Sequence, residues 1–259
     1  MLFLYKKEFF KLINQSKTYV LILLLIIQNM FFAVISSKYP SHFVSKELFV
    51  SDYASLSFIG IILIIHAASI IPMEFEFNTM KNILISKYSR QEIIISKILL
   101  TATYSIILYL IAMISTIINK FLFFQNDFYL NDHLKNSTQT IFRYWIETNA
   151  TNILTLWLIL SIVILISCAL KKSSIAVAIG IIGYLILNII SNSMFILIKK
   201  FHFLKWNPIN LLNLPLQVSL PDKMNKLTLL SNHQMIICII IYIIVFNIIS
   251  ITFFSKKEF

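Results

Sequence analysis

Few residues in this chain of 259 have the spacing that enzyme chemistry requires. A nucleotide-binding loop needs two glycines five positions apart followed by lysine. The three glycines, Gly60, Gly180 and Gly183, do not fit that pattern. The sequence also has no His-Glu-x-x-His pattern and no Gly-x-Ser-x-Gly elbow. We therefore expect a protein that is not an enzyme, with no catalytic, cofactor or metal site of its own.

Polar side chains inside apolar stretches are the next candidates, because they are costly in lipid. His66 is the titratable residue that lies deepest in such a stretch. It could relay a proton or contact a substrate, although a histidine satisfied by a neighbouring helix is the commoner case. Five amides also lie in apolar stretches: Gln28, Asn29, Asn188, Asn192 and Asn247. They could hydrogen-bond between helices. Alternatively, His66 and the last three could line a path for an amphipathic substrate.

The longest polar-rich interval between two apolar segments is residues 73–97, MEFEFNTMKNILISKYSRQEIIISK. Residues 79–87 have the pattern of a short amphipathic helix, with three apolar residues on one side and polar residues largely elsewhere. The apolar side holds Met80, Ile83 and Leu84, and the polar residues are Lys81, Asn82 and Lys87. Such a helix can lie on the membrane surface or dock in a groove of a partner.

Composition predicts that the surrounding segments lie in a membrane. Hydrophobic residues make up 58% of the chain, charged residues 13%, and mean hydropathy is +0.83. Six stretches are close to the length that crosses a bilayer. They are 19–35, 53–71, 98–118, 153–170, 175–198 and 235–254. None of them contains Asp or Glu, which disfavours a proton-coupled carrier.

Two further segments fit the membrane surface. Residues 1–17 form an amphipathic pattern with Leu2, Tyr5, Phe9 and Leu12 on one face, which predicts an interfacial helix leading into the first span. Residues 199–234 are apolar but interrupted by prolines, which predicts re-entrant or interfacial helices at the outer leaflet. The prolines are Pro208, Pro215 and Pro221.

The net charge of +11 comes from lysines that flank apolar runs, so we expect contact with membrane lipids and not with nucleic acid. The density of Lys and Arg favours a multi-pass protein of the cell membrane with both termini in the cytoplasm. Lys199, Lys200 and Lys205 fall outside in this topology and oppose it.

Residues of the interval 73–97 resemble the coupling segment of ABC-2-type transporter permeases. The matching residues are Glu74-Phe75-x-x-Asn78-Thr79-x-Lys81-Asn82-x-Leu84, Ser89-Arg90-x-x-Ile93 and Ser96-Lys97. In that family a Glu-Phe-x-x-Gly-Thr run ends the second span, and a helix that docks on the ATPase follows. A Ser-Arg turn and a Gly-Lys pair then open the third span. Asn78 and Ser96 stand where the family usually has glycine, and the proline before Ser-Arg is missing.

The order of elements is similar to that family over the whole chain. The resemblance implies an all-α integral membrane protein with six transmembrane helices of the ABC-2 (type V exporter-like) permease fold. Its single domain, 1–259, would hold an N-terminal elbow helix (1–17), a cytoplasmic coupling loop (73–97) and outer re-entrant helices (199–234). The implied ATPase-coupling residues are Glu74, Thr79, Lys81, Lys87, Ser89, Arg90 and Lys97. We expect the charged residues Glu74, Lys81, Lys87, Arg90 and Lys97 to dock on the ATPase as rim charges that set its orientation more than its affinity.

The implied partners are two copies of an ABC ATPase subunit, which binds ATP and Mg²⁺, and a second permease chain, either identical or a sibling. Among such permeases, the chain looks most like small Gram-positive peptide exporters, namely lantibiotic immunity and phenol-soluble-modulin export permeases. This implies ATP-driven export of amphipathic or cationic peptides, for toxin export or self-immunity. The alternative is an immunity protein that sequesters an antimicrobial peptide without an ATPase. An intramembrane protease would need paired catalytic residues that His66 alone does not supply.

Overall fold

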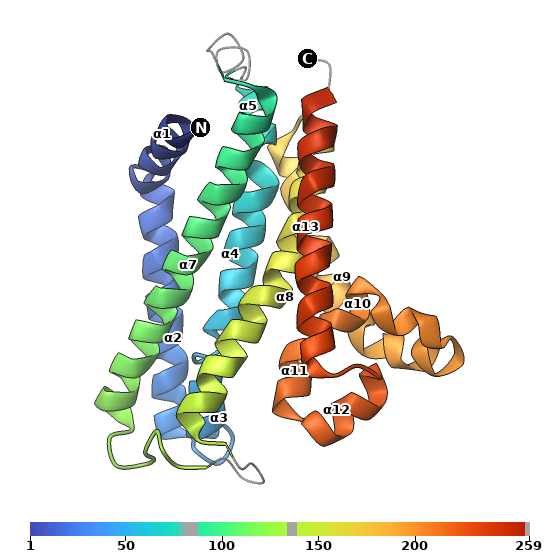
Figure 1. Ribbon diagram of the computed structural model, residues 1–259. Helices are drawn as coiled ribbons and strands as arrows, with labels where there is room; N and C mark the ends of the chain where they lie inside the picture. Colours follow the sequence, from blue (N-terminus) through green and yellow to red (C-terminus); the bar gives the residue numbers. More distant parts are fainter. Residues whose placement is uncertain (78, 80–87, 134–138, 257–259) are drawn as a thin grey trace. The chain divides into compact units, whose positions relative to one another are not determined.

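The computed structural model describes residues 1–77, 79, 88–133 and 139–256, and in this part of the chain the regular structure is helical (Figure 1). One isolated β-bridge, between His133 and Thr140, is the exception. The long helices are α1 (Leu2–Ile13), α2 (Ser16–Lys38), α4 (Ser55–Ser69), α7 (Arg90–Phe123), α8 (Ile141–Ala169), α9 (Ser173–Lys200) and α13 (Asn232–Lys256). The short ones are α3 (Ser45–Val50), α5 (Pro72–Glu76), η1 (His202–Trp206), α10 (Pro208–Leu211), α11 (Leu214–Ser219) and α12 (Pro221–Thr228).

Six helical stretches of the described chain are long and apolar enough to cross a membrane. They are Ser16–Lys38, Ser45–Glu76, Arg90–Phe123, Ile141–Ala169, Ser173–Ser191 and Asn232–Lys256. This confirms the prediction of an all-helical chain with six segments that could cross a membrane. Each of the six spans predicted from sequence overlaps one of them.

Two of the helices extend well beyond the predicted spans at their N-terminal ends. Helix α7 begins at Arg90 and not at residue 98, and α8 begins at Ile141 and not at residue 153. The first part of α8 is polar, and a polar stretch between two apolar ones predicts a loop. Its polar side chains are satisfied along the helix, because Arg143 Nε lies 2.9 Å from Glu147 Oε1 one turn on. Glu92 and Glu147 therefore lie in the helices but outside the predicted spans, which contain no Asp or Glu.

Prolines divide the chain between α9 and α13 into short helices, as predicted. Pro208 and Pro221 each occupy the first position of a helix, where the missing N–H costs no hydrogen bond. The Asn207 side chain accepts a hydrogen bond from the Ile209 amide, 2.9 Å away, and so caps α10. Leu211 and Leu214 are fully buried and pack with Met235 and Ile239 of α13.

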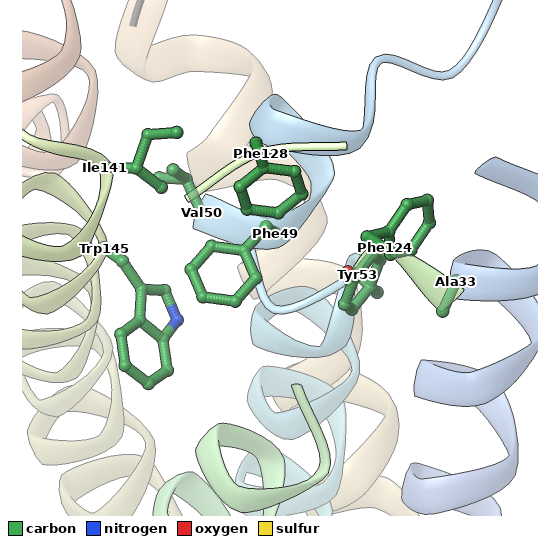
Figure 2. Close-up of a cluster of buried hydrophobic side chains, with 8 residues drawn as sticks. All are labelled: Ala33, Phe49, Val50, Tyr53, Phe124, Phe128, Ile141 and Trp145. Carbon is green, nitrogen blue, oxygen red and sulfur yellow. The ribbon is translucent and has the colours of Figure 1, made fainter. Parts of the chain in front are cut away.

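The chain divides into two compact units. The first comprises Met1–Lys11, Leu63–Ala102 and Ile153–Phe259, and the second comprises Leu12–Ile62 and Thr103–Asn152. The core of the second unit is aromatic. The ring of Phe49 lies 5.6 Å from that of Phe128 and 5.3 Å from that of Trp145, between centroids. Figure 2 shows these three side chains pointing toward one another.

The second unit also contains an unusual turn between α3 and α4. Asp52, Tyr53 and Ala54 have φ angles of 50°, 48° and 65°, in the left-handed region. Each such residue that is not glycine costs about 1–2 kcal/mol, so the surroundings must hold the turn in place. The Tyr53 amide donates to the Leu48 carbonyl at 2.7 Å. The side chain of Gln28 in α2 donates to the Tyr53 carbonyl at 2.9 Å.

Candidate functional site

Four charged residues of the first unit form a closed ring of alternating ion pairs, which we name the ion ring. Its members are Glu8 and Lys11 of α1, Glu74 of α5 and Lys97 of α7. Lys97 Nζ lies 3.1 Å from Glu74 Oε1 and 3.4 Å from Glu8 Oε2. Lys11 Nζ lies 2.9 Å from Glu8 Oε1 and 3.5 Å from Glu74 Oε1. The ring thus joins three helices that are far apart in the sequence.

Burial makes the ion ring different from a surface salt bridge. The Lys97 side chain is 2% exposed, and those of Glu8 and Glu74 are 7% and 11% exposed. A buried charge is tolerated when it is paired and hydrogen-bonded. Two carboxylates face two ammonium groups, so the ring has no net charge. Such a network holds helices in one arrangement and penalises any movement that separates its members.

Lys11 is the most exposed member of the ion ring. Burial alone would lower the pKa of its ammonium group. The hydrogen bond and charge of Glu8, together with the charge of Glu74, outweigh that effect and raise the pKa above its usual value. Lys11 therefore stays charged throughout the neutral range and keeps the ring electrically balanced.

Glu74 connects the ion ring to the predicted coupling interval. Helix α5 begins at Pro72, and Glu74 lies in its first turn, where the helix dipole favours a carboxylate. The Thr79 hydroxyl donates to the Glu74 carboxylate. The same hydroxyl also lies 3.3 Å from the Glu74 carbonyl. The start of the interval is therefore tied directly to the ring.

The other end of the interval is fixed by a capping box at the start of α7. The Ser89 amide donates to Glu92 Oε2 at 2.9 Å, and the Glu92 amide donates to Ser89 Oγ at 3.2 Å. The next residue, Arg90, donates from Nη1 to the Ser255 carbonyl of α13 at 3.3 Å. The Ser-x-x-Glu spacing was a signal in the sequence for this helix start.

A further contact links α5 to α9. The Glu76 carboxylate accepts hydrogen bonds from the Ser173 hydroxyl and from the Ser173 amide, the latter at 3.2 Å. Ser173 is the first residue of α9, so a carboxylate satisfies one of its unpaired N-terminal amides. Helices α1, α5, α7, α9 and α13 of the first unit are thus connected by polar contacts around the two ends of the interval.

The structure brings together only some of the predicted coupling residues. Glu74, Thr79 and Lys97 belong to or touch the ion ring, while Ser89 and Arg90 lie at the start of α7. Lys81 and Lys87, like most of the predicted amphipathic helix 79–87, lie outside the described residues. The prediction that Lys97 and Glu74 are exposed rim charges does not fit their burial in the ring. A role for these residues toward a partner stays a prediction.

The sequence pattern does not predict that Glu8 is buried, because it places the apolar face of α1 on Leu2, Tyr5, Phe9 and Leu12. Leu2 is 72% exposed, and the buried positions of α1 are Leu4, Glu8 and Leu12. The buried face is rotated because Glu8 pairs with Lys97. A contact across 89 residues of sequence leaves no local pattern.

The predicted substrate-path residues are dispersed along the first unit. His66 is half-buried in α4, with its Nε2 atom buried. The amides of Asn188 in α9 and Asn247 in α13 each donate to a carbonyl one turn back in their own helix, at 2.8 Å. Of Asn192 the structure describes the helical backbone only. In the described part of the chain, these hydrogen bonds of Asn188 and Asn247 thus stay within their own helices. A substrate path stays a prediction.

Asn29 of the second unit does hydrogen-bond between helices, as predicted. Its amide nitrogen donates to the Asp52 carbonyl and to Ser55 Oγ, both at 2.9 Å, and to Thr116 Oγ1 at 3.1 Å. Its amide oxygen accepts from Asn119 Nδ2 at 2.7 Å. Because Asn29 is fully buried, it fixes α2 against the left-handed turn and α7.

Asp52 is a buried carboxylate that the sequence did not reveal, because it lies one residue before the predicted second span. It is fully buried, and its Oδ1 atom accepts a 2.7 Å hydrogen bond from Trp145 Nε1. It holds α8 to the turn between α3 and α4. Among the residues that the structure describes, no group of three or more His, Cys, Asp or Glu side chains could hold a metal ion.

Comparison with known proteins gives one family. Residues 19–259 match the family described as "Protein of unknown function (DUF2705)", and no curated protein matches the sequence. The match begins within α2 and runs through α13, so it leaves out all of α1. Because it spans far more than half of the chain, the protein belongs to the DUF2705 family.

Proposed function

We propose that this protein is the transmembrane permease subunit of an ATP-driven exporter, powered by separate ATPase subunits that dock on the interval 73–97. The permease acts as a dimer in the cell membrane, with both termini in the cytoplasm. Its cargo is an amphipathic or cationic peptide, exported as a toxin or for self-immunity. The helices between residues 199 and 234 then lie at the outer leaflet.

The observation that best supports this proposal is the ion ring. An ATPase that pulls on the interval would act on α5 directly, and α5 carries Glu74, which pairs with Lys97 of α7 and Lys11 of α1. Force applied at one short segment would therefore reach two further helices of the first unit. Packed cores and buried charge networks respond by changing between discrete arrangements and not by gradual bending.

The ring also changes the roles of the coupling residues. Lys97 and Glu74 transmit movement within the permease, and the contacts to the ATPase fall on the residues between them. Arg90 is half-buried, and its guanidinium reaches the last turn of α13. We therefore assign docking to Lys81, Lys87 and Arg90, whose charges set the orientation of the partner more than its affinity.

Purification of the tagged chain from its native membranes in mild detergent tests the proposal. An ATP-hydrolysing subunit should co-purify, and a synthetic amphipathic cationic peptide should stimulate its ATPase activity. The double variant Lys87→Glu, Arg90→Glu should abolish that stimulation while the chain still inserts in the membrane. Lys7→Glu with Lys17→Glu makes the same charge change at exposed positions of the N-terminal region and should leave stimulation intact.

Two results would contradict the proposal. One is a detergent-stable preparation with no ATPase subunit that still binds the peptide, which is the behaviour of a sequestering immunity protein. The other is labelling of a cysteine placed at Lys81 or Arg90 from the outside of intact cells, because an ATPase could not reach that side.

A further inference from the structure

A second surface of the first unit combines positive charge with exposed aromatic rings. Residues 199–206, KKFHFLKW, comprise the last two residues of α9, Phe201 and all of η1, and we name them the basic aromatic segment. Phe203 is 72% exposed, Phe201 44% and Trp206 40%. The segment follows directly on a helix of 28 residues whose first part has the length and hydropathy of a membrane span. In a bilayer crossed by that helix, the segment would lie near the level where hydrocarbon changes to headgroups.

The ammonium groups of this segment lie against its rings. Lys200 Nζ lies 5.5 Å from the centroid of the Phe201 ring, and Lys205 Nζ lies 5.2 Å from that of Trp206. Lys199 and Lys200 are exposed. Within the described part of the chain, no hydrogen bond or salt bridge engages the ammonium groups of these three lysines. Each ammonium group has three N–H donors, so the segment presents several donors without an acidic partner.

The backbone that carries these cations is held firmly. The Tyr242 hydroxyl of α13 donates to the Trp206 carbonyl at 3.1 Å. The side-chain amide of Asn210 donates to the Lys205 carbonyl at 2.7 Å. A fixed backbone and cations that have no acidic partner together make a preorganised surface, because little ordering is needed when a ligand arrives.

We propose that the basic aromatic segment is a binding surface for anionic phospholipid headgroups. The phosphate oxygens accept hydrogen bonds from the lysines, and the exposed Phe203 ring inserts among the acyl chains next to the headgroup. Lysine near an anionic membrane surface contributes about 1 kcal/mol, and tryptophan favours the headgroup level. A soluble polyanion would satisfy the charges but would leave the rings exposed to water, so a lipid fits better. The inference stands apart from the proposed transport function and from the side of the membrane involved.

Helix α12 provides a matched control. Lys223 and Lys226 are exposed and carry the same charge, but no cation–ring contact involves them in the part of the chain described. Asp222 lies next to Lys223 and reduces the local positive potential. If any exposed pair of lysines attracted the lipid, removing either pair would lower the preference.

Tryptophan quenching tests the proposal with the full chain in vesicles. Phosphatidylglycerol with brominated acyl chains is titrated into phosphatidylcholine vesicles, and brominated phosphatidylcholine serves as the reference lipid. Quenching should reach half of its maximum at a lower mole fraction for phosphatidylglycerol. Trp206→Phe should remove the difference in quenching between the two brominated lipids, because the other two tryptophans, Trp145 and Trp157, lie outside the segment.

The charge variants then decide the outcome. Two lysines at about 1 kcal/mol each correspond to about 30-fold in relative affinity. We expect Lys200→Gln with Lys205→Gln to lower the preference for phosphatidylglycerol at least fivefold, and Lys223→Gln with Lys226→Gln to leave it unchanged. The proposal would be overturned if the two pairs of substitutions had equal effects, or if Lys200→Gln with Lys205→Gln had no effect. It would also be overturned if soluble polyphosphate displaced the lipid at the same ionic strength. Circular dichroism of each variant verifies that it is folded.

Discussion

Neutralising Lys97 should destabilise the protein by far more than breaking a surface salt bridge does. In Lys97→Met, two largely buried carboxylates, Glu8 and Glu74, are left with Lys11 as their shared cation in the ring. Removing one partner from a buried pair typically costs about 3–5 kcal/mol, because the remaining charge is desolvated without compensation. We expect a loss in that range from unfolding in mixed micelles with increasing SDS, followed by far-UV circular dichroism.

A second substitution, Glu74→Gln, should change stability in opposite directions in the wild type and in Lys97→Met. Glu74→Gln should destabilise the wild-type protein, because it leaves Lys97 and Lys11 with one carboxylate. The same substitution should stabilise Lys97→Met, because it restores a balance of one carboxylate, Glu8, and one ammonium group. The coupling between the two sites is then about 1–3 kcal/mol or more, and it is measured by the double-mutant cycle.

Arg143 and Glu147 serve as the matched control for geometry without burial. Their 2.9 Å separation is shorter than either contact of Lys97, but the Arg143 side chain is 69% exposed. Arg143→Met should therefore cost at most about 1 kcal/mol. The reasoning is refuted if Glu74→Gln has the same effect in both backgrounds, or if Lys97→Met costs no more than Arg143→Met.

Three further outcomes follow from local geometry. Ala54→Gly should raise the free energy of unfolding by about 0.5–1 kcal/mol, because glycine adopts a φ of 65° without the strain that alanine has there. As a control, Ala178→Gly in the exposed face of α9 should lower the free energy of unfolding by about 1 kcal/mol. Ser89→Ala should cost about 1 kcal/mol of helix stability and accelerate hydrogen exchange of the Glu92 amide, which loses its acceptor. Because the pKa of Lys11 is raised on folding, its contribution is complete below the ordinary pKa of 10.5 and is lost as pH rises through the folded value. The stability difference between the wild type and Lys11→Gln should accordingly shrink above about pH 10.5, as measured by unfolding at several pH values.

Sequence patterns predict the parts of this fold that depend on local composition. Hydropathy over about 20 residues identifies all six helical stretches of the described chain that are long and apolar enough to cross a membrane, since backbone groups in lipid must be satisfied within the segment. The prolines predict the short helices between α9 and α13 for a similar reason, because each one removes a donor and favours a helix start. The capping box at Ser89 and Glu92 was equally readable, and it would have corrected the start of α7.

The features that sequence reasoning missed are set by contacts between distant residues. Glu8 appears as one polar residue among lysines in α1 and becomes buried only because Lys97 meets it. The left-handed turn at Asp52 contains no glycine to indicate it, and it is maintained by side chains of α2 and α8. Buried polar groups in membrane helices find their partners by tertiary packing, so composition near the residue carries little information about them.

The ion ring also limits how the proposed coupling could work. Glu74 cannot leave its position alone, because Lys97 is 2% exposed and would remain as a buried ammonium group with one carboxylate partner in place of two. The low-cost movements keep Lys97 with both of its carboxylate partners, so α1, α5 and the start of α7 should shift as one body. A disulfide or cross-link that ties α5 to α7 near Glu74 and Lys97 should therefore preserve peptide-stimulated ATPase activity, and so should a link that ties α1 to α5 near Lys11 and Glu74. Loss of activity from the first link would show that the two helices separate during the cycle.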